Sequence, residues 1–259
     1  MKYGTISISD KGPIRTVTLD RPERRNAMTP KMQEELIAAM EEAVANGCRV
    51  LVFGGTGQAF CSGLDLSALQ AMRDQTVSEH RIDAERIARL FRTLYELPIS
   101  TIAAVNGAAI AGGAGLAMVC DFTLATPAAK FGFTEVRIGF VPALVSAFLA
   151  LQIGDKRTRD LLLTGRIFDA NEAWRLGLAN EVVPPEQLTQ RVQSLAEALL
   201  ANSPGAQQAT KRLMVMQNKA WLDSAIDAAL QNSVQARETA DFREGIAAFL
   251  EKRMPVWAK

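Results

Sequence analysis

The chain has 259 residues, of which 48% are hydrophobic and 22% charged, so it is long enough to bury a large core in one or two domains. Its 29 basic and 28 acidic residues give a net charge of +1, which excludes an overall field that attracts nucleic acid or a membrane surface. The three cysteines are scattered without CxxC spacing, which indicates a reducing compartment and argues against a metal site. Because the first residues lack the apolar segment of a signal peptide, we expect a cytoplasmic protein.

The first hundred residues predict alternating strands and helices. Apolar and polar residues alternate on both sides of Lys11-Gly12-Pro13, which indicates a β-hairpin. Thr29 followed by Pro30 is typical of a helix start, because threonine caps free amide groups and proline fits the first turn. In chain order we expect hairpin strands at 3–9 and 14–20, a helix at 30–46, a buried strand at 50–53, and helices at 64–72 and 78–97.

Residues 101–126, TIAAVNGAAIAGGAGLAMVCDFTLAT, predict a strand, a glycine-rich turn, a buried helix and a second strand. Gly112 and Gly113 stand at the start of the helix, where unpaired amides and the helix dipole suit an oxygen that gains negative charge. A second turn, at Gly63, should lie at the same end of the sheet, so we predict an oxyanion site there. A membrane span over residues 102–119 is the weaker alternative, because Asn106 and four glycines interrupt it, and a plain core segment is another.

The remaining chain is expected to be mainly helical. An apolar stretch at 131–140 holds one carboxylate, Glu135. Asn202-Ser203-Pro204-Gly205 breaks the chain and suggests a division into residues 1–200 and 201–259. We predict helices at 142–152, 156–163, 169–176, 185–201, 206–216, 220–235 and 238–252, and a short strand at 181–183.

Several spaced motifs resemble the enoyl-CoA hydratase/isomerase (crotonase) superfamily. They are RPERRNAM, AFCSGLDL, AAVNGAAIAGGAGLAMVCD and FTEVRIGFVP, and LLLTGRIFDANEAWRLGLANEVV and EGIAAFLEKRMPVW extend the resemblance over nearly the whole chain. The resemblance implies an α/β fold, with a ββα spiral core over 1–200 and a helical trimerisation region over 201–259. It also implies an acyl-CoA thioester substrate, no cofactor beyond the coenzyme A that the substrate carries, and a homotrimer or a hexamer of two trimers. No nucleic-acid or membrane partner is expected.

Carried over residue by residue, the resemblance places the two oxyanion amides on Leu64 and Gly112 and the catalytic acid/base on Glu135. Oriented amides stabilise the enolate that forms when the α-carbon gains or loses a proton. An apolar surround should raise the pKa of Glu135 toward neutrality, which suits proton exchange near pH 7. The expected substrate and coenzyme A contacts are Arg24, Arg25, Ala27, Cys61, Gly63, Asp65, Leu66, Gly113, Phe249 and Lys252.

Some of these contacts, and the single histidine of the chain, need a closer interpretation. Arg24 and Arg25 would meet the phosphates of coenzyme A. Asp65 stands at a helix start and is explained by capping alone. Cys61 has no histidine near it in sequence, so we interpret it as a small wall residue and not as a nucleophile. His80, the only histidine, lies among charges on a helix that we expect to be exposed.

The sequence departs from the resembling hydratases at one position. Their second glutamate falls on Gly115, which has no side chain. The motif details and the tail resemble a methylglutaconyl-CoA-type hydratase branch, so we predict an enoyl-CoA hydratase of fatty acid metabolism, with a branched or glutaconyl-type substrate. A Δ3-Δ2 isomerase with Glu135 as single base is the alternative, and a non-catalytic thioester-binding protein is a third. If the missing carboxylate limits hydration, a glutamate at position 115 should help it.

Overall fold

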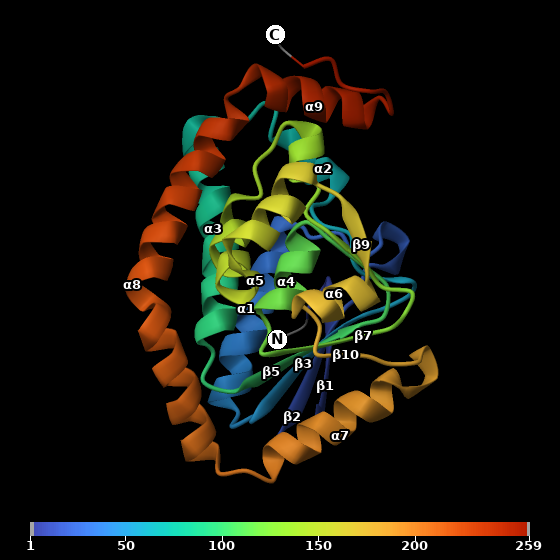
Figure 1. The fold of residues 1–259 in the computed structure, drawn as a ribbon, viewed down its shortest axis with the longest axis vertical. Coiled ribbons are helices and arrows are strands. Elements are labelled where there is room, and N and C mark those ends of the chain that lie inside the picture. Colours follow the sequence, from blue (N-terminus) through green and yellow to red (C-terminus); the bar gives the residue numbers. More distant parts are fainter. Residues whose placement is uncertain (1–2, 258–259) are drawn as a thin grey trace.

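The N-terminal hairpin begins the larger of two β-sheets in the computed structural model, which describes residues 3–257. Strands β1 (Ile6–Lys11) and β2 (Ile14–Leu19) pair antiparallel across Gly12, whose φ of 58° is easily adopted only by glycine. The next strands add in parallel and give the order β1-β2-β3-β5-β7-β10 (Figure 1). These are β3 (Val50–Gly55), β5 (Ser100–Val105), β7 (Phe122–Ala125) and β10 (Glu181–Val182).

A smaller sheet has the order β4-β6-β8-β9 and consists of three-residue strands. They are β4 (Ala59–Cys61), β6 (Ala108–Ile110), β8 (Lys130–Gly132) and β9 (Ile167–Asp169). Strands β3, β5 and β7 of the large sheet are each followed by one strand of the small sheet and then by a helix. These helices are α2 (Leu66–Ala71), α4 (Gly112–Val119) and the 3-10 helix η2 (Glu135–Ile138). The repeat confirms the predicted ββα spiral.

Helices cover both faces of the large sheet. Helix α7 (Leu188–Leu200) packs on one face through a cluster that includes Val50, Ile102 and Val192. The main core lies on the other face, under helices α1 (Pro30–Ala45), α3 (Val77–Glu96), α4 and α5 (Ala143–Thr164). Short elements complete the chain: η1 (Pro22–Arg24), α6 (Ala170–Leu176) and η3 (Pro185–Gln187).

The last two helices lie against the core. Helix α8 (Pro204–Arg237) runs along α3 on the outside of the molecule, and α9 (Ala240–Leu250) crosses one end of the molecule (Figure 1). Helix α9 also packs on η2. The C-terminal region therefore contacts the segment that carries Glu135.

Three sequence predictions need correction. Helix α8 continues through the break that was predicted near Asn218. The side chain of Asn218 is partly buried there, and its Nδ2 donates to the hydroxyl of Tyr95 and the carbonyl oxygen of Met214. His80 is only 2% exposed, because the face of α3 that carries it is covered by α8. The strands of the small sheet were missed, because three residues are too few for a visible alternation.

The apolar run at 102–119 does not form a single helix. It contains most of β5, all of β6 and all of α4, separated by turns. Within residues 3–257, no helix has both the length and the apolar character needed to cross a membrane.

Candidate active site

Two glycine-containing turns lie against each other where β4 and β6, which pair in parallel, reach their carboxyl ends. A Cβ atom on Gly63 would lie 3.1 Å from the carbonyl oxygen of Ile110 and 3.2 Å from the Cβ of Ala111. A Cβ atom on Gly113 would collide with Cys61. Only glycine allows this approach at both positions, so the predicted pairing of the two turns is explained by close backbone contact.

The backbone hydrogen bonds around the turns leave the amides of Leu64 and Gly112 without a backbone acceptor among the bonds described. Met28 donates to Gly63 O (2.7 Å) and accepts from Asp65 N (3.0 Å), so the N–H of Leu64 between them points away from Met28. Gly112 is the first residue of α4 and has no intrahelical acceptor for its N–H. Leu64 and Gly112 both line the same cavity of about 160 Å³.

Ala111 stores backbone strain between β6 and α4. Its φ of 51° and ψ of −121° are unusual for a residue with a side chain, and its amide is held by Gly132 O at 2.7 Å. Such strain persists only where the surroundings impose it. Here it stands directly before Gly112, the first residue of α4.

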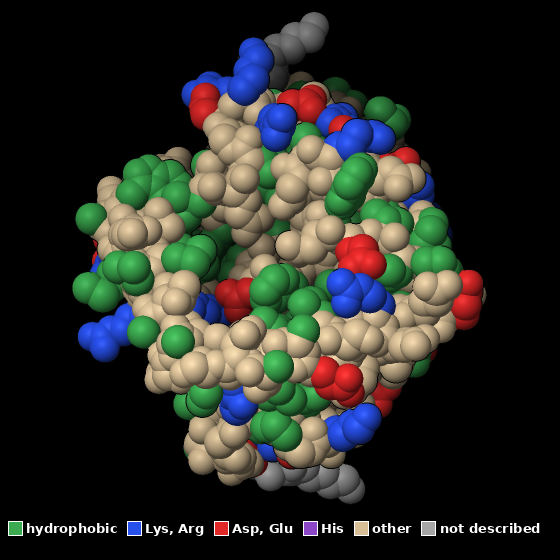
Figure 2. All heavy atoms as spheres, turned by 60° about the horizontal axis from the view of Figure 1, so that its bottom comes forward, with side chains coloured by type: hydrophobic (Ala, Val, Ile, Leu, Met, Phe, Trp, Pro, Cys, Tyr) green, Lys and Arg blue, Asp and Glu red, His purple; other side chains and the backbone are tan. Residues whose placement is uncertain are grey.

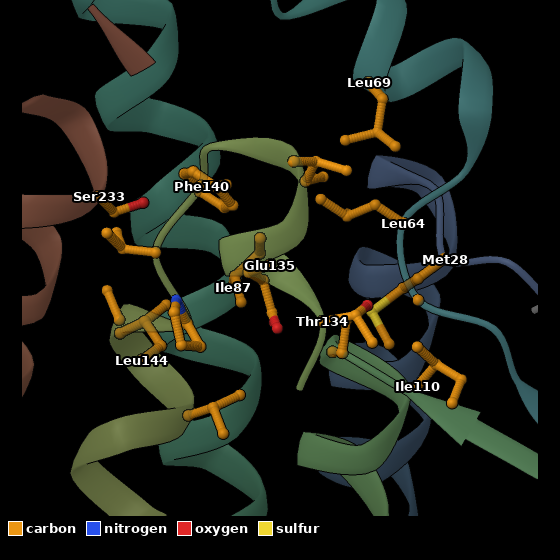
Figure 3. Close-up of a pocket in the computed structure, with 18 of the residues that line it drawn as sticks. Met28, Leu64, Leu69, Ile87, Ile110, Thr134, Glu135, Phe140, Leu144 and Ser233 are labelled. Atoms are coloured by element: carbon orange, nitrogen blue, oxygen red, sulfur yellow. The ribbon is translucent and has the colours of Figure 1, made fainter. Parts of the chain in front are cut away.

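Among the residues that the structure describes, Glu135 is the one that brings a carboxyl group to the cavity. It lies at the start of η2, and Figure 3 shows its side chain between Leu64 and Met28 on one side and Leu144 on the other. Part of the residue is accessible, but the Oε2 atom is buried and has no hydrogen-bond partner. Burial raises the pKa of Glu135 to about 7 against a smaller opposite effect of a backbone hydrogen bond, because the apolar surround disfavours the charged form.

Helix α9 holds the Glu135 segment in place. A Cβ atom on Gly245 of α9 would collide with the backbone of Ile138 in η2, and one on Gly139 would collide with Asp241. The two segments therefore touch backbone to backbone. Phe249, near the end of α9, also lines the cavity.

Comparison with known proteins identifies the family of the chain. A model of the family described as enoyl-CoA hydratase/isomerase matches residues 10–259. The chain belongs to the enoyl-CoA hydratase/isomerase family. A Thermus thermophilus protein named as a candidate enoyl-CoA hydratase is 41% identical over 247 residues, which cover 95% of this chain and 98% of that protein. A crotonyl-CoA hydratase of Syntrophomonas wolfei is 32% identical, with 98% and 97% covered. The crystal structure of an enoyl-CoA hydratase/isomerase from Xanthobacter autotrophicus Py2 matches with a TM-score of 0.89 and 30% identity, covering 97% and 98% of the two chains.

The side chains around Gly115 show how much space there is at the position where the resembling hydratases have their second glutamate. A Cβ atom on this glycine would lie 2.8 Å from Cζ of Phe91 and 3.2 Å from Cγ2 of Val145, and both side chains line the cavity. Phe91 is itself fixed by an edge contact with Phe148. Nothing larger than glycine fits unless Phe91 moves, and the expectation that a glutamate at position 115 helps hydration stays a prediction.

The other predicted substrate contacts fall into three groups. Gly63 and Phe249 line the cavity, whereas Ala27, Cys61 and Gly113 are buried behind it. Burial raises the pKa of the Cys61 thiol to about 11, which disfavours the reactive thiolate, and Cys61 does not line the cavity as a wall residue would. Arg24, Arg25, Leu66 and Lys252 are exposed and do not line it.

The exposed arginines lie near the cavity, whereas Asp65 has its own partners. Ser62, which lines the cavity, donates its amide to the carbonyl oxygen of Arg25 at 3.1 Å. The Asp65 carboxylate accepts from Ser67 N (2.9 Å) and from Arg21 (2.8 Å), so it caps α2 as the sequence indicated. A role of these residues in binding coenzyme A stays a prediction.

Sequence reasoning missed two polar residues of the cavity. Ser233 and Arg237 line it from α8 and are 4% and 3% exposed. Their spacing of four places them on one helix face, but polar residues occur all along α8, so nothing in the sequence distinguishes them from surface residues.

Proposed function

We propose that the protein adds water across the α,β double bond of an enoyl-CoA thioester. The observation that carries the proposal is the buried Oε2 of Glu135, which has no hydrogen-bond partner. Glu135 lines the same cavity as Leu64 and Gly112, whose backbone amides are the proposed oxyanion donors. Amides fixed by the fold stabilise an enolate oxygen without reorganising, and one such donor contributes about 3 kcal/mol to lowering the barrier.

A single carboxyl group can complete the reaction. Ionised Glu135 takes one proton from a water molecule, and the remaining hydroxide bonds to the β-carbon. The electron pair of the double bond moves to the thioester oxygen, where the amides of Leu64 and Gly112 hold the charge. Protonated Glu135 then gives its proton to the α-carbon, and the carbonyl reforms. A pKa of about 7 serves both steps, because neither form of the carboxyl is strongly favoured near neutral pH.

The cavity favours a short acyl group. Its volume of about 160 Å³ is close to that of an apolar protein cavity of about 150 Å³ that holds one benzene molecule. Its walls are mainly apolar, with Leu69, Ile87 and Phe140 among them. We therefore propose a short acyl chain, of the branched or glutaconyl type that the sequence indicates.

The family resemblance also suggests the assembly. We propose a homotrimer or a hexamer, with residues 201–259 at the subunit contacts. Exposed apolar side chains on α8 support this proposal, because large apolar groups gathered on a surface often mark an interface. They are Leu213, Met214, Met216 and Trp221.

The test follows the absorbance of the conjugated enoyl thioester. Incubation with crotonyl-CoA or methylglutaconyl-CoA should remove it, and Glu135→Gln should slow the loss by about 10²–10⁴-fold, the usual contribution of an acid/base group. The variant should fold because glutamine keeps the shape of the side chain, and circular dichroism checks this. A folded wild-type protein that hydrates no enoyl-CoA would contradict the proposal.

Double-bond isomerisation is a second candidate, favoured by the apolar wall of Phe91 and Val145 where a second acid would stand. In that reaction Glu135 removes a proton from the α-carbon of a 3-enoyl-CoA and returns it to the γ-carbon. The conjugated absorbance should then rise, and no ¹⁸O from labelled water should enter the product. Hydration instead incorporates the label, so the two reactions are separated by mass spectrometry.

A further inference from the structure

The cavity holds one positive charge, and it lies on the side away from the oxyanion turns. Among the described residues lining the cavity, Arg237 is the only basic one and Glu135 the only acidic one. Ser233 lies one helical turn before Arg237 on α8. Figure 3 shows Ser233 across the cavity from Leu64, with Glu135 between them.

One nitrogen of the Arg237 guanidinium has no hydrogen-bond partner. Its Nη2 donates to Asp83 Oδ2 at 2.8 Å, and its Nη1 donates to the carbonyl oxygen of His80 at 3.1 Å. The ring of Phe140 covers the guanidinium at 5.3 Å. The Nε atom is buried without a partner, and a buried donor in that state destabilises the protein unless a ligand supplies an acceptor.

The carboxylate that pairs with Arg237 is shared with a second arginine. Asp83 is the buried carboxylate of the cluster, and its Oδ1 also accepts from Arg86 at 3.0 Å. One carboxylate is thus shared by two guanidinium groups, while the acidic groups that also contact the cluster, Glu34 and Glu238, have side chains 54% and 47% exposed. Arg237 therefore shares its buried carboxylate partner with Arg86, which is less buried and also contacts Glu34.

We propose that Arg237 and Ser233 bind a carboxylate at the far end of the acyl chain, so that the substrate is the coenzyme A monothioester of a short unsaturated dicarboxylic acid. This inference rests on the proposed function, because that function places the thioester carbonyl at Leu64 and Gly112. A chain that begins there and passes Glu135 points its other end toward α8. A carboxylate at that end supplies the missing acceptor.

Binding of unreactive analogues tests the subsite separately from catalysis. Glutaryl-CoA ends in a carboxylate and pentanoyl-CoA, of the same chain length, in a methyl group. Isothermal titration should show that the wild-type protein binds glutaryl-CoA about 10- to 100-fold more tightly, the range of a hydrogen bond to a charged group. Equal affinities would overturn the inference, whereas the hydratase assay with crotonyl-CoA tests the proposed function by itself.

Variants then assign the preference to residues. Arg237→Gln should reduce the ratio of the two dissociation constants to about 1–3, and Ser233→Ala should lower it by about 2- to 10-fold, as for a neutral hydrogen bond. Arg86→Gln is the matched control, because it removes the other partner of Asp83 but does not line the cavity, and should keep the wild-type ratio.

An unchanged ratio in Arg237→Gln would overturn the inference. If that variant does not fold, Ser233→Ala decides, since it leaves the ion pair with Asp83 intact. A ratio that stays at the wild-type value in Ser233→Ala would then count against the proposal.

Discussion

The buried carboxyl of Glu135 should make the stability of the protein depend on pH. The folded state holds this proton up to about pH 7, whereas the unfolded chain releases it near the ordinary value of 4.5. Between these values the folded state binds more protons, so the free energy of unfolding falls as pH rises. The difference between 4.5 and about 7, at about 1.4 kcal/mol for each pH unit, amounts to about 3 kcal/mol.

Glu135→Gln removes this dependence while keeping the size of the side chain. The variant should therefore gain stability relative to the wild type as pH rises, by up to about 3 kcal/mol between pH 5 and pH 8. Urea denaturation at several pH values, followed by circular dichroism, measures the difference. Glu186→Gln, at an exposed position in η3, removes the same formal charge away from the cavity and serves as the control. A difference between Glu135→Gln and wild type that changes by less than about 1 kcal/mol over this range would refute the reasoning.

The same ionisation should appear in the kinetics. Because the ionised carboxyl accepts the first proton, kcat/KM should rise with pH through about 7 and then level off. A profile that is flat from pH 5 to pH 9 would show that Glu135 does not exchange the proton.

Three further substitutions probe the backbone around the site. Gly115→Glu should destabilise the fold by an overpacking cost of about 1–3 kcal/mol, because its Cβ meets Phe91, and should lower both the melting temperature and the activity. Gly115→Glu combined with Phe91→Ala should recover stability relative to Gly115→Glu alone in thermal melts. Gly245→Ala should reduce kcat at least tenfold without abolishing the fold, since it pushes η2 away at Ile138; a wild-type kcat in a folded variant would contradict this. Ala111→Gly should leave stability unchanged or raise it by about 1 kcal/mol, whereas a loss above about 1 kcal/mol in urea titrations would mean that Ala111 is not strained.

The sequence was sufficient to predict the local features of the site. The turns at Gly63 and Gly112 were found because a glycine before a helix start is a short-range signal. Contacts between distant segments could not be predicted in this way. Arg237 reaches the cavity only because α8 packs along α3, and the side chain that blocks position 115 comes from Phe91 on that same helix.

The backbone contact between α9 and η2 has a consequence for how the protein is made. Helix α9 leaves the ribosome more than a hundred residues after Glu135, a delay of roughly 5–20 s at translation rates of about 5–20 residues per second. A nascent chain therefore carries its acid before it has the segment that orients it. Catalytic competence should arrive abruptly, when the final helix docks, and not grow with chain length during synthesis.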